Sequence, residues 1–162
     1  MVTIDLKLVN RYEAVGYNPQ AVGYYDIDVD TSTGDLLLED GFDTSLIVSI
    51  FGERRAAQYE VAKPSQRRGW WGNTTRVDGH EDGSKLWLLD QARLTTGTVR
   101  LSGQYAYEGL KWLVEDGYLK SIETDPEAVV SNGNGSITLN VKLVRHDYKS
   151  ENKFFTVWEA TG

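Results

Sequence analysis

The sequence predicts an α+β domain in which an antiparallel sheet packs against about three helices. Apolar and polar residues alternate with a period of two near both ends of the chain. Between those segments, apolar residues recur at helical spacing. The order strands, helices, strands is typical of α+β folds. We expect residues 1–162 to form a single domain, because a chain of this length can bury a substantial core.

The first forty residues predict a strand followed by a hairpin. Every second residue from Val2 to Leu8 is apolar, which is the period of a half-buried strand. Residues 10–23 contain two glycines and an Asn-Pro pair, and they predict a loop. Residues 25–29 alternate again, and the turn-rich residues 31–35 lead from them into a short apolar run. We therefore expect a hairpin here.

Three helices are predicted in the middle of the chain. The first begins at Asp43, a residue suited to the N-cap position, and its apolar side continues to Phe51. The second covers residues 84–93, and the serine at its start can cap it. The third covers about residues 98–116, and Gly117 is placed to end it.

The last third of the chain predicts a three-stranded antiparallel meander. The strands are expected at residues 118–124, 137–143 and 154–158, of which the middle segment alternates most clearly. Residues 132–135 and 146–152 are rich in turn-forming types and connect them. With the N-terminal strand and hairpin, this meander would supply the antiparallel sheet of the domain.

Composition and charge exclude several classes of function. The formal net charge of −7 and the pI near 4.8 argue against binding of nucleic acid or of an anionic membrane surface. The chain has no cysteine, which excludes disulfides and thiolate chemistry and fits a reducing cytoplasm. No apolar run approaches the roughly 20 residues of a membrane-spanning helix, and the N-terminus does not have the pattern of a signal peptide.

The sequence contains no recognisable catalytic motif. His80 and His146 are far apart and do not have metal-ligand spacing. There is no nucleophile elbow, no phosphate-binding loop and no dinucleotide-binding glycine pattern. We therefore expect no enzymatic activity, no metal site and no cofactor.

Arginine and tryptophan pairs are the most informative local feature of the chain. Residues 66–72 read Gln-Arg-Arg-Gly-Trp-Trp-Gly, and a second arginine pair precedes them. Adjacent tryptophans point in different directions, so we expect one ring to fill the core and the other to meet a partner. Arginine and tryptophan are both enriched at interface hot spots. We predict a partner-binding site formed by Arg54, Arg55, Arg67, Arg68, Trp70 and Trp71. The alternative interpretation is that the arginines serve solubility and both tryptophans are core residues.

Several strings of residues, taken in order, resemble a known family. They are Ser-Leu-Ile-Val-Ser-Ile-Phe-Gly-Glu-Arg-Arg-Ala at residues 45–56, Arg-Arg-Gly-Trp-Trp-Gly at residues 67–72 and Gly-Ser-Lys-Leu-Trp-Leu-Leu at residues 83–89. Glu115-Asp116-Gly117 follows them after a helical stretch. This set resembles the Mu-like phage baseplate protein family, which is related to the baseplate wedge proteins of contractile-tailed phages. The resemblance covers roughly residues 34–160, and residues 9–25 look like an insertion that is atypical of the family.

The resemblance implies a structural virion protein. It implies a place in the inner baseplate around the tail tube, in a six-fold arrangement, with synthesis in the host cytoplasm. Larger wedge subunits, tail tube or hub proteins and the first ring of sheath subunits are the implied partners. The sheet would resemble the terminal domain of the sheath subunit and would help to initiate the sheath by strand exchange. The alternative is a domain of the tail that acts on or binds peptidoglycan or another glycan, since tryptophan pairs can stack on sugars.

Overall fold

The computed structural model describes most of the chain after residue 41 and short segments before it. The described residues are 5–6, 8–10, 25–27, 29, 31–33, 38–39, 42–75, 81–131 and 134–160. The chain forms two compact units, Met1–Ile47 and Val48–Gly162, and each is described by itself. The expectation of a single domain stays a prediction.

The described residues of the first unit form four short strands. They are β1 (Asp5–Leu6), β2 (Leu8–Asn10), β3 (Tyr25–Ile27) and β4 (Leu38–Glu39). β1 pairs with β4, and β2 pairs with β3, both antiparallel. Among the described strands β3 and β4 do not pair with each other, and residues 34–37, which would complete the expected hairpin, lie outside the described residues. Both segments pair instead with the N-terminal stretch, whose backbone offers hydrogen-bonding groups along its length. The predicted loop and insertion fall mainly on residues outside the described part.

The helix predicted at Asp43 is present. This helix, α1 (Asp43–Phe51), carries Asp43 in its first turn, where a carboxylate complements the helix dipole. Ile50 is fully buried, as its helical spacing predicts. Phe51 is half exposed and makes an edge contact with Phe155 of the last strand, with ring centroids 6.1 Å apart.

The third predicted helix is divided into α2 (Thr96–Leu110) and α3 (Trp112–Glu115). At the junction between α2 and α3 the helix narrows to a 3₁₀-type turn, because Val114 N–H donates to the carbonyl of Lys111, three residues earlier. The hydroxyl of Thr95 accepts a hydrogen bond from Thr98 N–H, 3.1 Å away, and caps α2. Gly117 ends α3 at a φ of 78°, as the sequence predicts.

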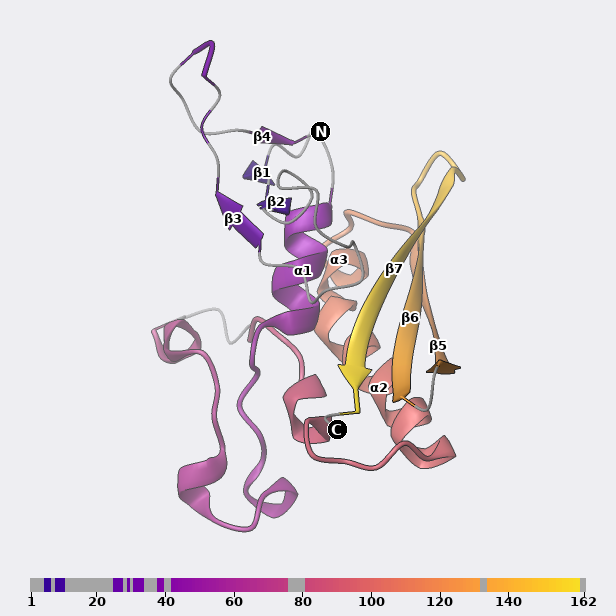
Figure 1. The fold of residues 1–162 in the computed structure, drawn as a ribbon. Coiled ribbons are helices and arrows are strands. Elements are labelled where there is room, and N and C mark those ends of the chain that lie inside the picture. The colour runs from indigo at the N-terminus through magenta and orange to yellow at the C-terminus, as the bar shows by residue number, and fades with distance from the viewer. Residues whose placement is uncertain are drawn as a thin grey trace. The chain divides into compact units, whose positions relative to one another are not determined.

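The predicted meander is confirmed, with longer strands than expected. Its strands are β5 (Ser121–Ser131), β6 (Asn134–Val144) and β7 (Ser150–Glu159), in the order β5-β6-β7 (Figure 1). Thr124 and Pro126 of β5 contact Gly103 of α2, so α2 packs on one face of the sheet. The buried apolar core of this unit consists of Ile50, Ala56, Leu86, Leu89, Ala106, Leu110, Leu113, Leu119, Ile122, Ile137, Leu139, Val141 and Leu143. The α+β class predicted from the sequence is therefore confirmed.

The helix predicted at residues 84–93 is wrong. The structure has a single 3₁₀ turn, η5 (Leu86–Leu89), in its place. The hydroxyl of Ser84 does accept a hydrogen bond from Leu86 N–H, as its capping role requires. A 3₁₀ turn places residues i and i+3 on one side, so Leu86 and Leu89 both reach the core without a longer helix. Among the described helices, none is long and apolar enough to span a bilayer.

Candidate partner-binding site

The six residues of the predicted site lie in one structural element, residues 53–75, which we call the arm. Its first residues, 53–56, lie between Ser84 on one side and residues 67–70 on the other. On one side Arg54 N–H donates to the Ser84 carbonyl at 2.8 Å. On the other side Trp70 N–H donates to the Glu53 carbonyl at 2.8 Å, and Ala56 N–H donates to Arg67 at 3.1 Å. The returning residues 67–70 thus lie antiparallel to the outgoing residues 53–56.

Three short turns complete the arm. They are η2 (Gln58–Glu60), η3 (Pro64–Gln66) and η4 (Trp71–Thr74), and Figure 1 shows them as separate turns in the segment that follows α1. None of the three contains a fully buried apolar side chain. The arm therefore depends on hydrogen bonds and ion pairs rather than on a core of its own.

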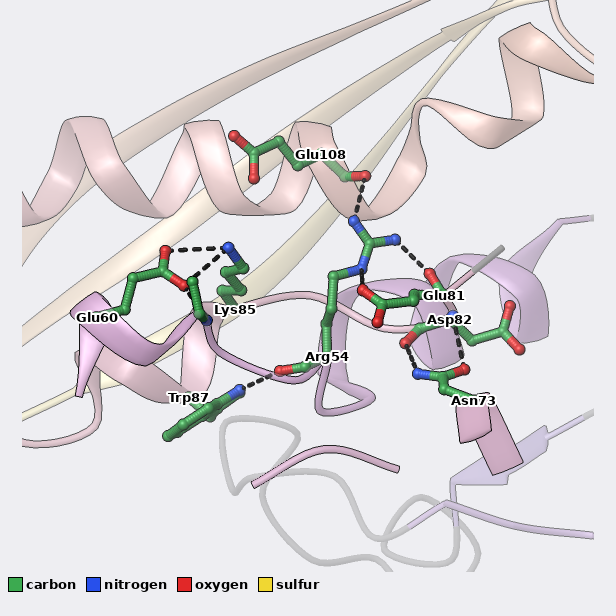
Figure 2. A network of polar contacts seen from close by, with 9 residues as sticks. Arg54, Glu60, Asn73, Glu81, Asp82, Lys85, Trp87 and Glu108 are labelled. Carbon is green, nitrogen blue, oxygen red and sulfur yellow. Dashed lines mark hydrogen bonds and ion pairs between the residues drawn. The ribbon is translucent and has the colours of Figure 1, made fainter. Parts of the chain in front are cut away.

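Arg54 holds the base of the arm. Its side chain is only 16% exposed, and its guanidinium donates to two main-chain carbonyls, Glu108 at 3.3 Å and Glu81 (Figure 2). The Glu108 carbonyl lies in the last turn of α2, where carbonyls lack helical partners and the helix dipole is negative. A cation is therefore well placed there, and Arg54 acts as a brace within the chain.

The other three arginines of the site have different surroundings. Arg67 donates from Nε to the Ala56 carbonyl at 2.6 Å and so reinforces the pairing within the arm. Arg68 lies 2.9 Å from a Glu53 carboxylate oxygen and 3.2 Å from an Asp90 carboxylate oxygen. Arg55 is exposed and has no side-chain partner in the part of the chain that the structure describes.

Two further contacts fix the arm, and sequence reasoning missed both (Figure 2). The side-chain amide of Asn73 donates to the Asp82 carbonyl and accepts from Asp82 N–H, each at 3.0 Å. Lys85 lies 2.9 Å from the Glu60 carboxylate, and both side chains are mostly buried, with 19% and 15% exposed. The Glu60 carboxylate also accepts a hydrogen bond from Ala57 N–H at 2.6 Å, and this third bond alone has a local signal in the sequence, because a separation of three residues suits a capping contact.

The two adjacent tryptophans lie at the surface. Trp70 is 48% exposed and Trp71 is 73% exposed, and their ring centroids are 5.9 Å apart. The expectation that one of them fills the core is therefore wrong. The ring of Trp70 lies directly over Gly72, where an added Cβ would be 2.4 Å from the ring. The Trp70 ring is thus partly covered by its neighbours Gly72 and Trp71, and not by the core.

The ion pair of Glu60 predicts a pH dependence of stability. Burial alone would raise the pKa of Glu60, but hydrogen bonds from Ala57 N–H and Lys85, with the Lys85 charge, lower that pKa below its ordinary value of 4.5. A lowered folded-state pKa means that the contribution to stability is present above the unfolded pKa. It is lost as the pH falls through the folded pKa.

We expect Glu60→Gln to lower the urea midpoint at pH 7 and to lower it much less at pH 3. Urea unfolding at the two pH values measures the difference. Glu127→Gln, which removes an exposed carboxylate on β5, controls for the change in net charge. An equal loss of stability by Glu60→Gln at both pH values would contradict the role assigned to this ion pair.

The part of the chain that contains the arm matches a known protein family. The sequence matches the family described as phage protein GP46 over residues 42–150, which include the whole arm. It is 33% identical over 129 residues to the Mu-like prophage FluMu protein gp46 of Haemophilus influenzae, covering 79% of this chain and 86% of that protein. It is 35% identical over 95 residues to baseplate protein gp46 of Escherichia phage Mu, covering 57% of this chain and 64% of that protein.

Proposed function

Because the chain belongs to the phage protein family described as GP46, a Mu-like baseplate family, we propose that it is a structural subunit of a contractile-tail baseplate. The membership predicted from the sequence motifs is confirmed by the family match. In the proposal the protein lies in the inner wedge around the tail tube, in a six-fold arrangement, and binds larger wedge subunits. It performs no chemical reaction there.

The exposed tryptophan on a braced arm is the observation that carries the proposed partner contact. Trp71 leaves 73% of its side chain exposed, and covering that surface is worth about 3 to 4 kcal/mol. The turn that carries Trp71 is held by the hydrogen bonds between Asn73 and Asp82. A large aromatic side chain on an ordered base loses little entropy on binding, which is typical of a hot spot.

We expect Trp71→Ala to fold normally and to weaken binding to the larger wedge subunits by about 2 kcal/mol, or roughly thirtyfold. The measurements are the affinity for the purified wedge subunits and the amount of the variant in assembled tails. Tyr148→Ala is the matched control, because Tyr148 is 75% exposed but lies in the turn between β6 and β7. Incorporation of Trp71→Ala into tails at the wild-type level would disprove the docking role.

The edge of β7 supports the proposed strand exchange with the first ring of sheath subunits. Among the strands that the structure describes, the sheet β5-β6-β7 leaves one edge of each outer strand without a neighbour. Pro126 lies near the middle of β5 and supplies no N–H, which weakens that edge for strand addition. The ten residues of β7 contain no proline and can offer a continuous set of donors and acceptors. We therefore assign the exchanged edge to β7.

A further inference from the structure

Charge is divided unevenly between the arm and the rest of the chain. The arm holds five arginine and lysine residues and two glutamates, which give it a formal charge of +3. The whole chain carries −7, so the residues outside the arm carry −10. A basic element on an acidic protein favours contact with an acidic surface.

Two cations of the arm are available for such a contact. Arg55 and Lys63 are exposed, and neither head group has an ion pair or hydrogen bond within the described ranges. The other three cations are engaged inside the chain by carbonyls and carboxylates. Tyr59 lies between Arg55 and Lys63 in sequence and is 87% exposed. The arm therefore presents exposed side chains that are both basic and aromatic.

The sheet face opposite α2, which we call the outer sheet face, is acidic and so complements the basic arm. Pro126 of β5 packs on α2, so the residues on either side of it, Asp125 and Glu127, point to the opposite face. Both are exposed and have no ion-pair partner among the residues the structure describes. A third carboxylate on this face, Glu123, is already paired with a lysine of β6 at 3.1 Å.

The same face also carries exposed apolar side chains. Asp125 pairs in register with Asn140 of β6, which in turn pairs with Phe154 of β7. Phe154 is 68% exposed, and Val129 of β5 is 40% exposed. Acidic and apolar groups thus lie within about 10 Å of each other across the sheet, at the usual strand spacing.

We propose that the arm of one copy of this chain docks on the outer sheet face of a second copy. Arg55 and Lys63 of the arm meet Asp125 and Glu127 of the sheet, and Tyr59 covers apolar surface beside Phe154. A second copy is the favoured occupant because one chain supplies both surfaces with matching unpaired charges and matching exposed apolar groups. This contact rests on the proposed function, because the baseplate is what brings several copies together around one tail.

The two surfaces differ, so the contact is heterologous. A head-to-tail contact of this kind leaves one arm and one sheet face open at the ends of every dimer, and it closes only in a ring. The geometry therefore connects neighbouring subunits of a cyclic arrangement without requiring a two-fold axis. Trp71 is not needed for this contact and stays available for a different subunit.

A charge-swap experiment on the purified full-length chain tests the proposal. Light scattering and sedimentation at low salt should show self-association of the wild-type chain, weakened by salt because exposed charges are screened. Arm reversal (Arg55→Glu with Lys63→Glu) and sheet reversal (Asp125→Lys with Glu127→Lys) should each lower the association constant by about tenfold or more. A one-to-one mixture of the two reversed variants should associate again, because each arm then faces a sheet of opposite charge.

The outcomes separate this proposal from its alternatives. Recovery of association in the mixture supports an arm-to-sheet contact between copies. A wild-type chain that stays monomeric up to millimolar concentration at low salt overturns it, and so does association that survives both reversals. Loss of binding to wedge subunits by the arm reversal, with self-association unchanged, would assign the arm to an acidic surface of another baseplate protein and would also overturn it.

The test is independent of the test of the proposed function. Trp71→Ala should leave self-association unchanged, whereas the arm reversal should leave Trp71 in place for the wedge subunits. If Trp71→Ala enters tails normally while the charge swap behaves as expected, the docking role of the tryptophan fails and the contact between copies stands. If instead Trp71→Ala fails to enter tails while the charge swap has no effect on self-association, the contact between copies is disproved and the docking role of the tryptophan stands.

Discussion

Gly83→Ala is expected to lower the free energy of unfolding by about 2 to 5 kcal/mol, the largest effect among the substitutions considered. Gly83 has a φ of 94°, which strains any residue with a Cβ. An added Cβ would also lie 2.5 Å from the Gly52 carbonyl oxygen. That oxygen accepts the Ser84 N–H that joins the base of the arm to the chain after it. Relief of the clash would therefore break this bond.

Gly117→Ala is the matched control for that prediction. Gly117 has a φ of 78°, but nothing lies within 4 Å of an added Cβ. Its replacement isolates the strain of the backbone, which costs about 1 kcal/mol. Chemical unfolding of both variants compares them directly. Equal losses of stability would show that the close approach of Gly83 to Gly52 contributes nothing beyond its backbone angle.

Arg54→Met should cost about 2 kcal/mol or more of unfolding free energy. The thioether side chain replaces the aliphatic part of Arg54 but leaves the Glu81 and Glu108 carbonyls without their donor. Loss of the donor costs about 1 to 3 kcal/mol at the part-buried Glu108 carbonyl, whereas the exposed Glu81 carbonyl can bond water instead. Because these bonds hold the base of the arm, amide hydrogen exchange in the arm should also become faster in this variant.

Arg55→Met provides the control, since it makes the same replacement one residue later. Arg55 is exposed, and no partner of its side chain occurs in the described residues. Its substitution should change the unfolding free energy by less than about 0.5 kcal/mol. If denaturant midpoints fell equally in the two variants, Arg54 would not be a brace.

The sequence predicts the parts of the fold that depend on local periodicity. α1, the helical stretch that forms α2 and the meander all follow from spacings of two to four residues. The outcome at residues 84–93 does not follow from periodicity, because Leu86 and Leu89 satisfy both a helix and a 3₁₀ turn. Contacts with distant residues decide between the two, as in the bond from Trp87 Nε1 to the Arg54 carbonyl.

The candidate site is less predictable because its supports lie far apart in the sequence. Arg54 and Glu108 are 54 residues apart, and Glu60 and Lys85 are 25 residues apart. No short-range pattern connects such pairs. The different surroundings of Arg54 and Arg55 do follow once the segment is known to be extended, since successive side chains then point to opposite sides. Neighbouring identical residues thus acquire different roles.

Most bonds that hold the arm end on main-chain atoms, and this determines which positions are free to vary. Arg54, Arg67 and Asn73 reach carbonyl and amide groups of residues 56, 81, 82 and 108, and these groups are present whatever side chain the position carries. Substitutions at residues 82 and 108 can therefore accumulate without loosening the arm, whereas residue 81 is more constrained because the Glu81 carboxylate also lies 4.0 Å from Arg54 Nε. Related proteins can therefore differ in the surface side chains around the arm, and so suit different partners, while the arm keeps its shape.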